Sequence, residues 1–208
     1  MMMTTSLFEK HRVACDVDGV VTNYTQMYLN AVRIGAGRDI PQDWKPPSWD
    51  LDECLGLTSD EKDKAYRLMN GPGMAGLINP YPDAVAGIKA LMDVADVFFV
   101  TSSLKSSPTW DYDRRKMIVK VFGEEAAEGL TFTDHKYTFG ADMFIDDKPD
   151  HCEEWMAAWP DGVALLWAAN YSVTSLHDEI PHVYDWDEVC RRVALLPTTR
   201  YKPVTRKE

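Results

Sequence analysis

The stretch Val13-Ala14-Cys15-Asp16-Val17-Asp18-Gly19-Val20-Val21 decides the fold class of this 208-residue chain. An apolar run leads into two aspartates that are separated by one residue and followed at once by a glycine. A buried strand with this ending delivers two carboxylates to the end of a sheet, where they can attack phosphorus, move a proton or hold a divalent cation. The same pattern also occurs as a plain turn, because Asp and Gly favour turns. Residues elsewhere in the chain are needed to distinguish these two interpretations.

The composition argues against several classes of protein. A formal net charge of -11 is unsuited to binding nucleic acid polymers or an anionic membrane, because both need basic patches. No apolar run is long enough to cross a membrane, and the start of the chain lacks the apolar segment of a signal peptide. The cysteines form no Cys-x-x-Cys pair, so neither a zinc site nor a disulfide framework is predicted. We therefore expect a reducing, cytoplasmic location.

Short apolar runs predict the strands of one sheet, at residues 12–16, 94–101, 129–133, 142–146 and 163–168. Their apolar residues are continuous rather than alternating, which is typical of a parallel sheet that is covered on both faces. Amphipathic segments between the runs predict helices at residues 82–93, 111–122 and 150–159. This alternation implies an α/β fold with right-handed crossovers.

The connection between the first two predicted strands is far longer than a crossover helix needs. Residues 22–34 look helical, and Thr58-Ser59-Asp60-Glu61 resembles a capping box for a helix that runs to about Met69. The segment between them, residues 41–51, is rich in Pro and Trp. This connection is either an ordinary structural insertion or a small helical cap that closes over the aspartates, and we favour the cap.

The predicted organisation is therefore a Rossmann-like, three-layer α/β core with a mostly helical cap inserted after the first strand. We assign residues 1–22 and 80–197 to the core and residues 23–79 to the cap. Residues 198–208 are polar and basic, so we expect them to form a flexible C-terminal tail.

Polar residues follow four of the predicted strands at the points where these strands end. The groups are Asp16-Val17-Asp18, Thr101-Ser102-Ser103, Thr133-Asp134-His135-Lys136 and Asp146-Asp147-Lys148. Each group alone could be a turn, a helix cap or solvated surface. Their occurrence together, in order, points to a common site, because ligands gather at the carboxyl ends of parallel strands.

The residue types at these strand ends suit phosphoryl transfer, which depends mainly on positioning and charge neutralisation. The carboxylates of Asp16, Asp146 and Asp147 offer the oxygen ligands that Mg2+ prefers. The hydroxyls of Thr101 and Ser102 can hold phosphate oxygens, and Lys136 adds a positive charge for the phosphate and the nucleophile.

The four strand ends resemble those of the haloacid-dehalogenase-like (HAD-like) phosphohydrolase superfamily, and most of all its 5'(3')-deoxyribonucleotidase family. The likeness rests on Asp16-Val17-Asp18-Gly19-Val20-Val21, Val100-Thr101-Ser102-Ser103, Lys136 with Ile145-Asp146-Asp147-Lys148, and Pro80-Tyr81-Pro82-Asp83-Ala84. The resemblance implies a Mg2+-dependent phosphatase that hydrolyses a (deoxy)nucleoside monophosphate to nucleoside and phosphate. Related nucleotidases often form dimers, so it also implies a homodimer as the assembly to test.

The resemblance also implies roles for the site residues. Asp16 would attack phosphorus and form an aspartyl-phosphate, while Asp18 would protonate the leaving oxygen and then activate water. Mg2+ would be held by Asp16, by the backbone carbonyl of Asp18 and by one of Asp146 and Asp147. Thr101, Ser102 and Lys136 would bind the phosphate.

The predicted cap bears on the choice of substrate. Tyr24 stands where the family has a Phe, and Trp44 and Trp49 either stack on a base or form the core of the cap. Two departures leave a pyrimidine preference open: Gly73-Met74-Ala75-Gly76 lacks the family's aromatic pair, and Asp134 stands near the place of a family Arg. A sugar phosphate or another small phosphoester is therefore an alternative substrate. A non-catalytic binding module on the same fold is the third interpretation.

Overall fold

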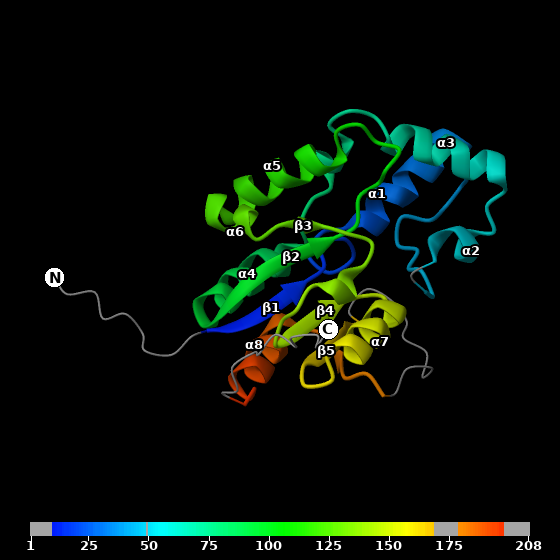
Figure 1. Cartoon of the computed structure of the whole chain (residues 1–208). Helices are drawn as coiled ribbons and strands as arrows, with labels where there is room; N and C mark the ends of the chain where they lie inside the picture. The colour runs from blue at the N-terminus through cyan, green and yellow to red at the C-terminus, as the bar shows by residue number, and fades with distance from the viewer. Residues whose placement is uncertain (1–9, 49, 169–178, 198–208) are drawn as a thin grey trace, which may run out of the picture.

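A computed structural model describes residues 10–48, 50–168 and 179–197, and this part of the chain contains one parallel six-stranded sheet (Figure 1). The strand order is β3-β2-β1-β4-β5-β6, which places β1 next to both β2 and β4. The strands are β1 (His11–Cys15), β2 (Ala95–Thr101), β3 (Thr131–Phe132), β4 (Met143–Asp146), β5 (Val163–Trp167) and β6 (His182–Val183). The predicted α/β class and parallel sheet are confirmed, whereas β6 was not predicted.

Helices cover both faces of the sheet, as the continuous apolar strands require. Along β4, Ile145 contributes to a core cluster with residues of α4 (Pro82–Val94), α5 (Trp110–Phe122) and α8 (Trp186–Ala194). The next residue toward the N-terminus, Phe144, belongs to a separate cluster and stacks on Trp155 of α7 (Pro149–Ala158). The three helices predicted at residues 82–93, 111–122 and 150–159 match α4, α5 and α7. Neither α8 nor the short α6 (Glu124–Glu128) was predicted.

Residues 23–79, called the insertion below, connect β1 to β2 and are mostly helical. They contain α1 (Tyr24–Ala31), the π-helical turn η1 (Val32–Ala36), α2 (Leu51–Leu55), α3 (Ser59–Met69) and the 3-10 turn η2 (Met74–Leu77). The predicted capping box is present, because Glu61 Oε2 accepts from Thr58 N at 2.9 Å and Thr58 Oγ1 accepts from Glu61 N at 3.4 Å. The helix predicted from residue 22 begins at Tyr24, since the side chain of Asn23 caps it.

The two ends of the insertion lie side by side. Asn23 N donates to Asn79 O at 2.9 Å, and Tyr81 N donates to Val21 O at 2.9 Å. The chain therefore leaves and re-enters the sheet region at one place, directly after Asp18. Figure 1 shows α1, α2 and α3 gathered beyond one end of the sheet. The division into core and cap at these residues stays a prediction, and the predicted tail at residues 198–208 lies outside the described residues.

None of the described helices has the length and apolar character needed to span a membrane.

Gly87 on α4 tests how tightly α8 packs on the sheet layer. A methyl carbon added at Gly87 would lie 2.0 Å from Cγ of Trp186, so the helices would have to move apart. We expect Gly87→Ala to lower the free energy of unfolding by about 1–3 kcal/mol in urea titrations, although Ala favours helices. Gly76→Ala is the control, because its added carbon meets nothing closer than 3.7 Å. Equal stability of the two variants would contradict this packing.

Candidate active site

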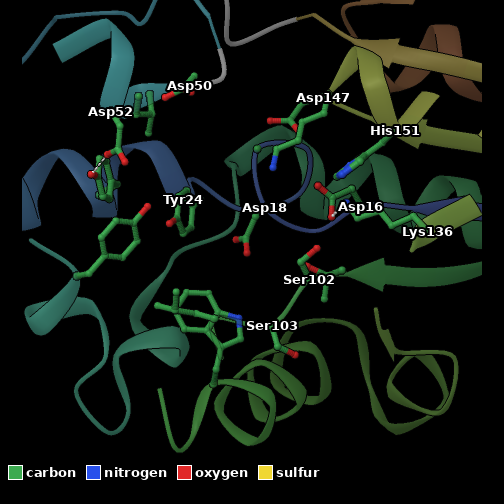
Figure 2. Close-up of a pocket in the computed structure, with 18 residues that line it drawn as sticks. Asp16, Asp18, Tyr24, Asp50, Asp52, Ser102, Ser103, Lys136, Asp147 and His151 are labelled. Atoms are coloured by element: carbon green, nitrogen blue, oxygen red, sulfur yellow. Dashed lines mark hydrogen bonds and ion pairs between the residues drawn. The ribbon is translucent and has the colours of Figure 1, made fainter. Parts of the chain in front are cut away.

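A cavity of about 340 Å³ lies at the carboxyl ends of the central strands, between the sheet and the insertion (Figure 2). From the sheet side it is lined by residues that follow β1, β2 and β4, together with Lys136 of the turn η3 (Lys136–Thr138). From the opposite side it is lined by residues of α1, α2 and α3. The structure thus brings distant segments of the chain together around one space.

The loop after β1 turns both aspartates toward this cavity. Asp16 N donates to Ile145 O at 2.9 Å, so Asp16 is held at the carboxyl end of the sheet. The chain then folds back tightly, with Gly19 N donating to Thr22 O at 2.9 Å and Thr22 N donating to Val17 O at 2.7 Å. Gly19 adopts a φ of 88°, which a side chain would strain. The glycine of the opening motif is therefore what allows Asp16 and Asp18 to line the same cavity.

Lys136 is buried between two carboxylates. Its Nζ lies 2.7 Å from Asp16 Oδ1 and 2.7 Å from Asp146 Oδ2, and all three side chains are at most 5% exposed. Burial lowers the proton affinity of an amine, but the two carboxylates outweigh it and hold the pKa of Lys136 well above its ordinary value. Lys136 therefore neutralises part of the negative charge that the two strand ends concentrate here.

The two neighbouring carboxylates differ in proton affinity. Burial raises the pKa of Asp16 to about 6, although the ion pair with Lys136 opposes this shift. Burial acts on Asp146 in the same direction, but Lys136 and His151 outweigh it and hold the pKa of Asp146 below its ordinary value. Asp146 also accepts from the backbone of Lys148 at 2.9 Å and lies 3.1 Å from His151 Nδ1. Its two oxygens are thus fully engaged by the protein.

Asp147 completes a group of three carboxylates. One oxygen from each of Asp16, Asp146 and Asp147 can be chosen so that all lie within 4.8 Å of one another, and all three residues are buried. Oxygen ligands at this spacing fit a hard divalent cation such as Mg2+, whose charge would offset the remaining repulsion. Asp147 and Asp16 both line the cavity, whereas Asp146 is fully buried and does not line it.

Hydroxyl groups at the end of β2 face the same space. Thr101 is buried at the last position of the strand, and Thr101, Ser102 and Ser103 all line the cavity. The Ser103 hydroxyl donates to Asp111 of α5 at 2.6 Å, so it already has a partner. Ser102 makes a longer contact of 3.4 Å with a backbone carbonyl, that of Thr133. The predicted phosphate-binding residues are thus placed beside the carboxylates.

The other end of the cavity is aromatic and acidic. The rings of Tyr24 and Tyr28 are nearly parallel with centroids 6.3 Å apart, and Trp110 meets Tyr24 edge-on at 6.4 Å. Burial raises the pKa of both tyrosines, so they stay neutral near pH 7. In Figure 2, Asp18 and Tyr24 lie between the two ends, with the labelled groups Asp16, Lys136, Asp147 and His151 on one side and Asp50 and Asp52 on the other.

Trp44, one of the two tryptophans named from the sequence, does not line this cavity. Trp44 packs on the hydrophobic cluster of the insertion and lines a second, smaller pocket with Gln26 and Tyr81. Trp49 lies outside the described residues. Asp134, which stands near the place of a family Arg, forms an ion pair with Lys105.

Comparison with known proteins now adds to this geometry. A family model described as "5' nucleotidase, deoxy (Pyrimidine), cytosolic type C protein" matches residues 10–195. The chain belongs to this nucleotidase family. Residues 10–195 include all four strand-end groups, so the family match covers the whole sheet side of the cavity.

The nucleotidase relatives are distant in sequence. The mitochondrial 5'(3')-deoxyribonucleotidase of Mus musculus is 27% identical over 144 residues, which is 67% of this chain and 65% of that protein. The cytosolic type from Homo sapiens is 24% identical over 141 residues, 66% of this chain and 70% of that protein. The match thus spans a little less than two thirds of the mouse protein's length.

Solved structures confirm that this nucleotidase-family chain has a HAD-like fold. A HAD-like hydrolase of Streptococcus pneumoniae aligns with a TM-score of 0.60 at 15% identity, covering 88% of this chain and 98% of that one. A HAD family hydrolase of Deinococcus radiodurans, with bound phosphate and sodium, aligns with a TM-score of 0.59 at 14% identity, covering 90% and 97%. At these identities the likeness concerns the fold alone.

Sequence reasoning missed several residues of the nucleotidase-family cavity and its surroundings: Tyr28, Tyr66, Trp110, Arg114 and His151. One of them carried a signal. Arg114 lies three and four residues before Met117 and Ile118, so a charge sits on the apolar side of a predicted helix. A buried arginine needs a carboxylate partner, so this position predicts an ion pair with an acid elsewhere in the chain.

Lys136→Met tests the balance of charges in this nucleotidase-family site. Without divalent cations at about pH 7.5, we expect the free energy of unfolding to fall by about 3 kcal/mol or more, because Asp16 and Asp146 lose their shared cation. The loss should shrink toward about pH 5.5, since removing Lys136 takes away the ion pair that opposes the raised pKa of Asp16. The folded variant then binds a proton more readily than the folded wild-type protein, and the unfolded chain binds none in this range. Urea titrations at both pH values measure this.

Lys89→Met is the matched control for that experiment, because Lys89 is exposed on α4. Its change should stay within about 0.5 kcal/mol at either pH. A Lys136→Met variant that matched this control would show that the ion pairs with Asp16 and Asp146 contribute nothing to stability.

Proposed function

We propose that this chain is a Mg2+-dependent phosphomonoesterase that hydrolyses a (deoxy)nucleoside monophosphate through an aspartyl-phosphate. The observation that carries the proposal is the meeting of Asp16, Asp18, Lys136 and Asp147 around one cavity whose opposite end is aromatic. The family match supports a nucleotidase, and the mouse and human relatives are named as 5'(3')-deoxyribonucleotidases.

In the first step, a carboxylate oxygen of Asp16 attacks phosphorus and the bond from phosphorus to the ester oxygen breaks. Asp18 gives a proton to the departing oxygen, which leaves as the nucleoside hydroxyl. In the second step, Asp18 takes a proton from water as the water oxygen attacks phosphorus. The bond to Asp16 then breaks, and inorganic phosphate and free Asp16 result.

Charge neutralisation makes the approach of a phosphate to Asp16 feasible. Lys136 already lies 2.7 Å from the Asp16 carboxylate, and the hydroxyls of Thr101 and Ser102 offer hydrogen bonds to phosphate oxygens. When bound, Mg2+ would supply further positive charge at this point. Asp16, the Asp18 carbonyl and Asp147 would hold it, because Asp147 lines the cavity and Asp146 does not.

The insertion side of the cavity suits a nucleoside. A base that enters this end of the cavity would stack on one of the rings that line it, such as Tyr24 or Trp110, at a gain of about 1–3 kcal/mol per base. Asp50 and Asp52 at that end would repel a second phosphate group. This combination favours a monophosphate with one aromatic base over a bisphosphate.

A phosphate-release screen over nucleoside monophosphates and sugar phosphates tests the function. We expect release that requires Mg2+, is abolished by a chelator and returns when Mg2+ is restored. Asp16→Asn should fall below about 1% of the wild-type rate, because an amide cannot attack phosphorus. Asp63→Asn, an exposed position on α3, is the matched control and should retain full activity. No release by folded wild-type protein from any substrate would refute the proposal.

Tyr24→Ala tests the aromatic end of the cavity. We expect KM for the best nucleotide to rise about 5- to 150-fold, the equivalent of losing about 1–3 kcal/mol of stacking, with little change for ribose 5-phosphate. Tyr112→Ala on the exposed side of α5 is the control and should leave both constants unchanged. If Tyr24→Ala raises KM equally for both substrates, then the ring does not contact the base and a sugar phosphate becomes the better assignment.

A further inference from the structure

Arg114 is a buried cation that the steps above do not use. It lies on α5 with 1% of its side chain exposed, and its Nη2 forms an ion pair with Asp18 Oδ1. Its Nη1 lies 3.4 Å from Thr22 Oγ1, and its guanidinium carbon lies 5.2 Å from the centre of the Trp110 ring. Arg114 does not itself line the cavity, so it touches the site through Asp18.

Thr22 holds the same oxygen of Asp18. The Thr22 hydroxyl is fully buried and donates to Asp18 Oδ1 at 2.8 Å. Two donors from separate parts of the fold therefore converge on Oδ1, one from the loop after β1 and one from α5. Oδ2 receives neither of these bonds, and the Asp18 side chain is 20% exposed where it lines the cavity.

We propose that Arg114 and Thr22 are positioning residues that anchor Asp18 through Oδ1, and that Oδ2 is the oxygen that exchanges the proton. This inference rests on the phosphatase function proposed above. It assigns a separate task to each oxygen of one carboxylate: Oδ1 fixes the side chain, and Oδ2 does the chemistry.

The position of the proton in each step agrees with this assignment. With a proton on Oδ2, Oδ1 is the carbonyl oxygen of a carboxylic acid and still accepts from Thr22 and Arg114. When Oδ2 gives its proton to the leaving oxygen, Oδ1 keeps both bonds, and Oδ2 can then take a proton from water. The side chain therefore need not rotate between the two steps. Arginine suits the task because its guanidinium stays charged and cannot supply the proton itself.

The position of Arg114 is itself well determined. Trp110 and Arg114 are one helical turn apart on α5, so the indole face supports the guanidinium. Within the described part of the chain, Asp18 is the carboxylate that pairs with Arg114. A buried arginine without a carboxylate would be strongly destabilising, which favours a single arrangement of the pair.

Substrates with different leaving groups separate positioning from general damage. A nucleoside departs as a poor leaving group that needs a proton, whereas p-nitrophenol departs from p-nitrophenyl phosphate as a stable anion. We expect Arg114→Met to lower kcat/KM, which reports on the first step and not on the later hydrolysis common to both substrates, by about 30-fold or more for the best nucleoside monophosphate. For p-nitrophenyl phosphate, kcat/KM should fall by less than about 3-fold. Arg114→Lys should recover much of the loss. Thr22→Val, which removes the second donor with little change in shape, should show the same selective pattern.

Arg115→Met is the matched control, because Arg115 is exposed on the next position of α5 and donates to Ala127 O at 2.7 Å. It should leave both rates unchanged. Circular dichroism and thermal unfolding with each variant report on folding, and Thr22→Val decides the question if Arg114→Met does not fold. A folded Asp18→Asn variant should lose kcat/KM selectively for the nucleotide, and adding Arg114→Met or Thr22→Val to it should have no further selective effect on kcat/KM.

If folded Arg114→Met, or Thr22→Val, lost kcat/KM equally for the two substrates, the positioning role would be overturned. Failure of the wild-type protein to hydrolyse either substrate would instead refute the proposed function. The two failures are thus distinguishable, because only the second one involves the wild-type protein.

Discussion

The buried ion pairs of Lys136 are the interaction on which the site depends. β1 and β4 are neighbours in register, Cys15 opposite Ile145, so the acids that follow these strands necessarily lie side by side. Two buried carboxylates at this spacing would repel each other and destabilise the sheet edge. A single lysine from a turn far along the chain, 2.7 Å from each, removes that conflict. The arrangement needed for chemistry is thus also needed for folding.

The central part of the fold could be predicted because its strands are buried on both faces. Continuous apolar runs marked five strands, and polar residues directly after them marked where the chain leaves the sheet. β6 was not predicted because Pro181 stands between Ile180 and His182, so no apolar run marks a strand there. α8 was missed although Asp185 caps it and Trp186, Val189 and Val193 share one face. Both the capping residue and the spacing of the apolar residues are visible in the sequence.

The candidate site divides in the same way. Asp16, Asp18, Thr101 and Asp147 stand at or just after the ends of strands, so the sheet brings them together. The residues on helices depend on how those helices pack, which local sequence does not encode. Trp44 looked as suitable as any aromatic residue, yet it lines another pocket. Trp110, the first residue of α5, lines the cavity instead. The sheet side of a site is therefore more predictable than the insertion side.

The paired backbone bonds between residues 21–23 and 79–81 have an evolutionary consequence. A segment that departs and returns at one point can grow, shrink or be exchanged without shifting the register of any strand. On the proposed function, variation in residues 23–79 would alter the substrates accepted and leave the residues of the proposed reaction in place. The same junction adjoins Asp18, and the Thr22 side chain within it donates to Asp18 Oδ1, so such variation must spare Thr22. Sequence variation is thus tolerated within the insertion and constrained at the junction where the insertion joins the rest of the chain.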